Sequence, residues 1–534
     1  MKKYYSFLLL LAITLSASAN NVQLTNISVS NNVTNTGKVI QFDVSWENSW
    51  RTASTGNYDG VWVFFKFKDY DGIWKHLNFT TSNVTLPSGV SYSFGNNGTN
   101  LGVGMFLYRS NNGTGTFSII NAKAGITSVP GTYDLRGFAL EMVDIPQASF
   151  YIGDSSGFGY DYKKAPGIAP YLVNGNGASI TVGNANGNLK DGFNGYLGNL
   201  QGFPTGYNEF WCMKYELSRA GFRDFLNCLT YAQQANLFFI SKPPSSATGS
   251  YPFGSGSSGL SGNDIEIKTP GIQATNTGAV IGCDFDNDDI FDESTDGEWK
   301  AVNVINWAIE ASYLDWAGLR PMTEMEFEKI CRGPSYPLPD EYPWGTASVD
   351  TNNYILTNAG KLNELVSNTS SIDGNAFYNV TALGGQEPLR SGIFANAFSS
   401  RVSSGASYYG VMEMGGNVIE LCVTSHNPAG RSFTGKNGNG FITTHGYADE
   451  NNWPGINGVT DTSQVLGVYD GGIGVRTTAG LLERGSYFSG PELYMQISSR
   501  IGAFILNGGG SPISNSLTTY YSTKYGIRGV RDAN

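Results

Sequence analysis

The chain has 534 residues, of which 40% are hydrophobic and 14% are charged. This composition excludes a disordered, charge-rich protein, because burial of so much apolar surface can offset the entropy lost on ordering. The formal net charge of −11 also argues against nucleic acid and anionic membrane surfaces as partners, because like charges repel.

The N-terminus has the three parts of a secretory signal peptide. Lys2 and Lys3 form the positive part, residues 7–15 the apolar core, and residues 17–19 (Ala-Ser-Ala) a small-residue cleavage site. The core is too short to span a membrane, and no later segment approaches about 20 apolar residues. We therefore expect cleavage near Ala19 to remove the signal peptide, residues 1–19. The mature chain is predicted to be secreted, extracellular or at the cell surface, with no membrane span.

Residues 20–137 are predicted to be all-β. Residues 39–46 alternate between apolar and polar side chains, as do the last residues of 61–68. Clusters of Asn and Gly at 96–98 and 111–113 are typical of the turns between strands. Because no helical period occurs here, we expect a β-sandwich.

Residues 138–534 combine glycine-rich loops with three helical patterns. One follows Ser218, which can cap a helix, and a second covers residues 304–317. The third begins at Thr323, where Thr323 and Glu326 match a capping box. With the β-sandwich, these helices predict an α+β protein with domains at 20–137 and 138–534.

Five cysteines are scattered along the chain without a C-x-x-C pair. An odd count leaves at least one thiol outside any intramolecular disulfide, and the pairing of the others stays open. We expect most of them to be small core residues: Cys212, Cys228, Cys283, Cys331 and Cys422.

Several motifs in the second region occur in the order of a known family. Residues 316–328 read WAGLRPMTEMEFE, 410–420 read GVMEMGGNVIE, 484–487 read RGSY and 525–531 read YGIRGVR. Together with segments at 142–153 and 213–227, they resemble the formylglycine-generating enzyme (sulfatase-modifying factor) family. The resemblance spans 138–534 and implies a glycine-rich fold related to C-type lectin domains.

The resemblance implies a copper site made by two cysteines in the catalytic members. The corresponding positions here hold Ser489 and Tyr494, and no cysteine follows Cys422. A hydroxyl and a phenol stay neutral and hard, whereas Cu(I) requires soft thiolates. We therefore expect no catalytic residues of the family type, and neither copper nor iron. The three histidines lack the helical spacing of an iron site: His76, His426 and His445.

The resemblance also implies a structural calcium site around the G-N-x-x-E motif. Carried over, its ligands are the side chains of Glu413 and Glu420 and the carbonyl oxygens of Gly416 and Val418. Oxygen donors in flexible loops suit Ca²⁺. The alternative is a tight turn with solvated carboxylates.

A second candidate calcium site resembles an EF-hand loop. Its ligands would be the side chains of Asp284, Asp286, Asp288 and Asp292, with the carbonyl oxygen of Ile290. Four carboxylates within nine residues repel one another unless a cation neutralises them. The missing glycine at the sixth position and Thr295 at the twelfth favour the alternative, a solvated acidic turn.

These observations favour an exported, non-catalytic binding or structural protein built on the formylglycine-generating enzyme-like fold. Its partner would be a protein or glycan at the cell surface, or further copies of itself. Two alternatives stay open: an oxidase-type enzyme with an altered active site, and a lectin-like glycan binder that depends on calcium.

Overall fold

The computed structural model describes residues 21–31, 37–53, 56–96, 100–127, 134–156, 160–192, 197–239, 241–253, 263–380, 387–396, 398–456, 480–501 and 522–533. The predicted signal peptide lies outside these residues. Among the helices in the described part of the chain, none has the length and apolar character that crossing a membrane requires.

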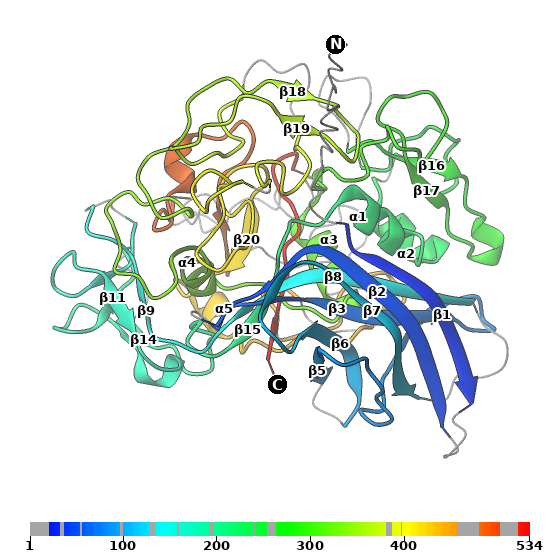
Figure 1. The fold of residues 1–534 in the computed structure, drawn as a ribbon, viewed down its shortest axis with the longest axis horizontal. Helices are drawn as coiled ribbons and strands as arrows, with labels where there is room; N and C mark the ends of the chain where they lie inside the picture. Colours follow the sequence, from blue (N-terminus) through cyan, green and yellow to red (C-terminus); the bar gives the residue numbers. More distant parts are fainter. Residues whose placement is uncertain are drawn as a thin grey trace, which may run out of the picture.

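The N-terminal region is a β-sandwich of two antiparallel sheets, drawn mainly in blue in Figure 1. One sheet has the order β1 (Gln23–Asn31), β2 (Lys38–Arg51), β7 (Gly113–Ile126). The other has the order β22 (Val530–Asp532), β15 (Phe210–Met213), β8 (Asp134–Ile145), β3 (Asp59–Lys68), β6 (Gly102–Arg109), β5 (Val90–Asn96), with β4 (Trp74–Leu77) paired to β3.

Strand β3 is buried on both faces. Val61, Val63 and Phe65 enter the core between the two sheets, whereas Trp62 and Phe64 enter the core of the following domain. The Trp62 indole Nε1 donates a hydrogen bond of 2.8 Å to the Ala317 carbonyl oxygen. The second sheet therefore serves as a shared wall, with the sandwich on one face and the loop-rich domain on the other.

The two regions form a continuous structure at this wall. The predicted boundary between residues 137 and 138 falls inside β8, which passes from the sandwich into the second region without a break. Strands β15 and β22, which belong to the second region, extend the same sheet beyond β8.

The helices begin where the sequence places their caps. The three predicted helices are confirmed as α1 (Arg219–Leu226), α3 (Trp307–Trp316) and α4 (Glu324–Arg332). In α4, Thr323 and Glu326 form the predicted capping box. A second capping box, made by Thr230 and Gln233, begins a helix that was not predicted, α2 (Tyr231–Leu237). A short helix, α5 (Pro428–Arg431), lies in a late loop.

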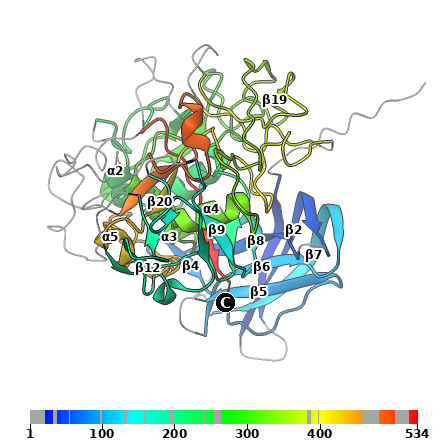
Figure 2. The same ribbon diagram turned by 90° about the vertical axis from the view of Figure 1, so that its left-hand side faces the viewer.

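Within the described residues, the rest of the second region consists of loops joined by four short strand pairs and one small four-stranded sheet of order β10-β13-β12-β14, seen in teal to orange beside the sandwich in Figure 2. These strands are β9 (Phe150–Ile152), β10 (Lys163–Lys164), β11 (Tyr171–Val173), β12 (Thr181–Val182), β13 (Leu189–Lys190), β14 (Gly198–Asn199), β16 (Ile265–Thr269), β17 (Val280–Cys283), β18 (Leu356–Thr357), β19 (Leu365–Val366), β20 (Glu420–Val423) and β21 (Leu481–Arg484). The protein is thus α+β, with a β-rich N-terminal region and a loop-rich second domain.

Candidate functional site

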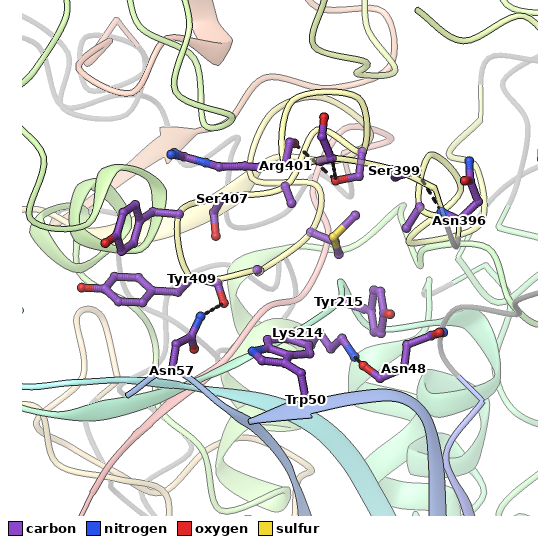
Figure 3. Close-up of a pocket in the computed structure, with 17 residues that line it drawn as sticks. Asn48, Trp50, Asn57, Lys214, Tyr215, Asn396, Ser399, Arg401, Ser407 and Tyr409 are labelled. Atoms are coloured by element: carbon purple, nitrogen blue, oxygen red, sulfur yellow. Dashed lines mark hydrogen bonds between the residues drawn. The ribbon is translucent and has the colours of Figure 1, made fainter. Parts of the chain in front are cut away.

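A cavity of about 380 Å³ lies between the end of β2 and the loop at 395–412, and we call it the seam cavity (Figure 3). The sandwich contributes one wall and the second domain the other. It is lined by Asn48, Trp50, Asn57, Lys214, Tyr215, Ala395, Asn396, Ser399, Ser400, Arg401, Ser404, Ala406, Ser407, Tyr408, Tyr409, Gly410 and Met412.

Lys214 fixes the floor of the seam cavity. Its Nζ lies 2.9 Å from the Glu141 carboxylate and 3.2 Å from that of Asp59, and all three side chains are buried. Burial opposes the ammonium charge, but Glu141 and Asp59 hold the pKa of Lys214 above its ordinary value. The same Nζ lies 4.7 Å from the centre of the Trp50 ring, which restrains this ring at the cavity wall.

The opposite wall is held by hydrogen bonds to backbone oxygens. Asn57 Nδ2 donates to the Tyr409 carbonyl oxygen at 2.9 Å, which joins the sandwich to the loop across the cavity (Figure 3). Arg401 Nη2 donates to the carbonyl oxygens of Cys331 at 2.9 Å and Pro343 at 2.7 Å. The cavity is therefore built from restrained side chains on both sides.

The lining residues combine aromatic rings with hydroxyl and amide groups. Four rings supply apolar surface, while asparagines and serines supply hydrogen-bond donors and acceptors. The described residues that line the cavity include no Asp, Glu, His or Cys. The cavity therefore offers groups for binding, and neither a thiolate nor a carboxylate or imidazole base for catalysis.

The positions expected to carry the copper ligands hold oxygen groups. Ser489 lies after β21, and Tyr494 lies in a short 3-10 helix, Glu492–Met495; both are half-buried. All five cysteines lie in the described residues, are buried and form no disulfide. Burial raises the pKa of Cys212 to about 12 and of Cys228 to about 11, and it raises the pKa of the other three thiols as well. This donor set does not fit a copper ion, which needs a pair of thiolates.

The two glutamates of the family-type calcium site are both buried and partly satisfied. Glu413 Oε1 accepts a hydrogen bond of 2.6 Å from the Gly392 amide, and Glu420 Oε1 accepts one of 2.9 Å from Arg528 Nε. The second oxygen of each carboxylate, Oε2, is buried without a hydrogen-bond partner. Burial raises the pKa of both carboxyls to about 7.

A third carboxylate, Glu216, belongs to the same cluster and was missed in the sequence. It accepts hydrogen bonds from Asn417 Nδ2 and from the Val418 amide, at 3.2 Å for the latter. Its signal in the sequence was an acidic residue inside the largely apolar segment 210–217, and the structure buries Glu216 with its neighbours. The orphaned Oε2 atoms of Glu413 and Glu420 fit an ion with oxygen ligands such as Ca²⁺. The carboxylates of these two residues and Glu216 do not all converge within 4.8 Å, however, and Arg528 offsets part of their charge. Glu413 and Glu420 would hold the ion with the predicted carbonyl oxygens of Gly416 and Val418.

The structure brings some of the predicted EF-hand-like ligands together and separates others from them. Carboxylate oxygens of Asp284, Asp286 and Asp296 lie within 4.8 Å of one another, and Asp286 forms a similar group with Asp288 and Glu293. Burial, together with the neighbouring Asp286 and Asp284, raises the pKa of Asp296 to about 6. Asp296 and Glu293 were not among the predicted ligands.

Two of the predicted ligands, Asp292 and Ile290, do not join these carboxylate groups. Asp292 Oδ1 lies 2.8 Å from Arg223 Nη1, and its Oδ2 lies 2.9 Å from Lys268 Nζ, so both oxygens are engaged in ion pairs. Ile290 has a side chain that is 58% exposed. The loop thus departs from EF-hand geometry, as expected without a glycine at its sixth position.

The fold is a β-sandwich that shares one of its two sheets with a loop-rich, sparsely helical domain. Residues 199–476 match the family described as sulfatase-modifying factor enzyme 1-like domain. Since the match covers slightly more than half of the chain, the protein belongs to the sulfatase-modifying factor family. A search of curated proteins finds no significant match. The matched range includes α3, α4 and the motif at 410–420, while Ser489 and Tyr494 lie beyond it.

Proposed function

We propose that this protein is an exported, non-catalytic binding protein whose sulfatase-modifying factor domain serves as a rigid platform. The proposal rests on the side chains that could serve as copper ligands. Ser489 and Tyr494 stand where the resemblance places the thiolate pair, and all five cysteines of the chain are buried with raised pKa values. Export rests on the charge and hydropathy pattern of residues 1–19.

We propose the seam cavity as the binding site and a glycan as its ligand. Sugars present apolar ring faces next to many hydroxyl groups, and the cavity offers aromatic rings next to serines and asparagines. Trp50 and Tyr408 supply rings from opposite walls, and both are partly exposed.

Calcium at Glu413 and Glu420 would stabilise the platform in this proposal. The buried Oε2 atoms of these residues would gain a partner, and the repulsion among Glu216, Glu413 and Glu420 would be relieved. The calcium would act on folding, since the seam cavity is lined by none of these three residues.

A glycan array probed with the purified mature chain tests the binding site. We expect a set of glycans to bind. The Trp50→Ala variant should lose at least tenfold in affinity for them, because a stacked aromatic surface is removed. Tyr70→Ala is the matched control, since Tyr70 is 73% exposed and lies outside the cavity. Equal loss in both variants, or binding only to peptides, would overturn the assignment of a glycan to this cavity.

The absence of catalysis needs a separate measurement. The mature chain is incubated with Cu(I) and a cysteine-containing peptide, and the peptide mass is followed with heat-denatured protein as the control. We expect equal, slow oxidation in both samples. Enzyme-dependent conversion of the cysteine would contradict a non-catalytic role without affecting the glycan assignment.

A further inference from the structure

The acidic loop that follows β17 contains a buried carboxylate with an oxygen that no protein group satisfies. Asp296 is fully buried, and its Oδ1 has no hydrogen-bond partner. Its Oδ2 accepts a hydrogen bond of 2.8 Å from the Glu293 amide. An unsatisfied carboxylate oxygen at such a depth is costly unless a cation or a proton compensates it.

Two further aspartates bring their oxygens to the same place. Asp284 is 1% exposed and Asp286 is exposed, and their ligand oxygens lie within 4.8 Å of each other and of Asp296. Both Asp284 oxygens accept backbone amides, from Asp288 at 3.2 Å and Asp289 at 3.1 Å. These bonds hold the carboxylate in place and leave lone pairs on each oxygen for a metal.

The nearby cations are committed elsewhere. Arg223 pairs with Asp292 and Glu298, and Lys268 also pairs with Asp292. Lys300 pairs with Glu387 at 2.8 Å. Across the part of the chain that the structure describes, no ion pair within 4.0 Å reaches the acidic loop carboxylates, which are Asp284, Asp286, Asp288, Glu293 and Asp296.

We propose that Asp284, Asp286 and Asp296 bind a calcium ion, with Asp288 and Glu293 as further oxygen donors at the exposed side. All donors are oxygens on a loop, and the group formed by Asp286, Asp288 and Glu293 adjoins the buried group through Asp286. This arrangement suits the larger, more flexible coordination shell of Ca²⁺ rather than the strict octahedron of Mg²⁺. Asp292, which the sequence pattern includes, is excluded because Arg223 and Lys268 occupy its oxygens.

The bound ion would order the loop that joins β17 to α3. Thr295 Oγ1 donates to Asp286 Oδ2 at 2.7 Å, and the Gly297 amide donates to the Gly360 carbonyl oxygen at 2.8 Å. A cation between Asp286 and Asp296 would therefore join the start of the loop to its middle, next to the segment that contacts residue 360. This site is independent of the seam cavity and of the family-type calcium site.

Calorimetric titration of the EDTA-treated mature chain with CaCl₂ tests the assignment. We expect Asp286→Asn and Asp296→Asn each to remove one calcium from the stoichiometry, or to weaken that site at least tenfold. Asp292→Asn is the matched control and should keep the full stoichiometry. Asp286 is exposed, so its variant remains informative if Asp296→Asn fails to fold.

Terbium luminescence places the ion independently. The Tyr251 hydroxyl donates to Asn287 Oδ1 at 2.6 Å, so this ring is a nearby sensitiser. Tyr251→Phe should reduce the emission and leave the calcium stoichiometry unchanged. Full stoichiometry in both Asp286→Asn and Asp296→Asn would overturn the proposal. A loss in Asp292→Asn equal to theirs would assign the EF-hand-like ligand set instead.

Discussion

The sandwich and the sulfatase-modifying factor domain bury their interiors in different ways. Between the two sheets the core is apolar, with Ile40, Phe42 and Trp46 facing Val63 and Phe65. The second domain also has apolar clusters, but it buries a set of fully enclosed arginines: Arg219, Arg320, Arg332, Arg484, Arg500 and Arg528.

The difference follows from how each region satisfies its backbone. Paired strands bond their amides and carbonyl oxygens to one another, whereas loops leave carbonyl oxygens that need other donors. Lys329 Nζ, for example, donates to the carbonyl oxygens of Pro146 at 2.7 Å and Gly206 at 2.5 Å. Arg332 donates to the Tyr151 carbonyl oxygen at 3.1 Å while pairing with Glu341. Buried cations thus do for the loops what strand pairing does for the sandwich.

The largest effect is expected from removing one of these cations. Arg500→Met leaves the buried Glu324 carboxylate without its closest cation, whose Nε lies 2.6 Å away. Breaking such a pair costs about 3–5 kcal/mol in free energy of unfolding. Denaturant unfolding measures it. The control in the sandwich is Lys75→Met, which breaks an exposed pair with Asp69 and should change stability little. Similar losses in both variants would contradict the distinction between the regions.

A pH effect is expected where β8 passes from one region to the other. Burial, then Glu209, raises the pKa of Asp144 to about 8, so the folded state holds a proton that the unfolded state releases near pH 4. Asp144 alone should therefore lower the free energy of unfolding by about 1.4 kcal/mol for each pH unit as pH rises towards 8. Asp144→Asn should reduce this slope between pH 6 and 8.

The comparison of slopes is needed because other buried carboxyls, Glu413 and Glu420 among them, act in the same direction. Burial and Asp154 raise the pKa of Asp161 to about 8. Its contribution persists in Asp144→Asn, so only the difference between the two proteins reports on Asp144. Identical slopes in chemical denaturation at pH 6, 7 and 8 would show that Asp144 is ionised in the folded state.

The shared sheet gives a third prediction. Trp62→Phe keeps an aromatic ring in the wall but removes the 2.8 Å hydrogen bond to the Ala317 carbonyl oxygen and part of the buried volume. Loss of a buried partner costs about 1–3 kcal/mol in free energy of unfolding. Trp74→Phe, at a half-buried position on β4, is the control and should cost less. Separate unfolding transitions in Trp62→Phe, followed by calorimetry, would show that the wall couples the two regions.

Local sequence patterns predicted the helices and strands well, whereas contacts between segments far apart in the chain could not be predicted. Alternation predicted β2, and capping residues predicted α1 and α4, because these signals lie within a few residues. The sheet that continues through β8 into β15 and β22 could not be predicted, since it joins segments far apart in the chain.

The candidate sites show the same limit. Sequence spacing grouped Asp284 with Asp292, but Arg223, from α1, and Lys268, from β16, draw Asp292 away. Glu216 is about 200 residues from the Asn417 amide that it contacts. The seam cavity could not be predicted from the sequence, because its walls come from two segments that are far apart in the chain, β2 and the loop at 395–412.

The smallest effect concerns two helix caps in the second domain. Thr323 Oγ1 accepts the Glu326 amide at 3.2 Å and donates to the Pro204 carbonyl oxygen at 2.9 Å, so it both caps α4 and holds a loop. Ser218 Oγ accepts only the Gly221 amide, at 3.2 Å, among its described contacts. Thr323→Ala should cost about 1–2 kcal/mol in free energy of unfolding, and Ser218→Ala should cost less than this. Thr323→Ser, which keeps the hydroxyl, should recover most of the loss. An equal cost for both alanine variants, with no recovery by serine, would mean that the loop contact adds nothing and that the lost methyl packing dominates.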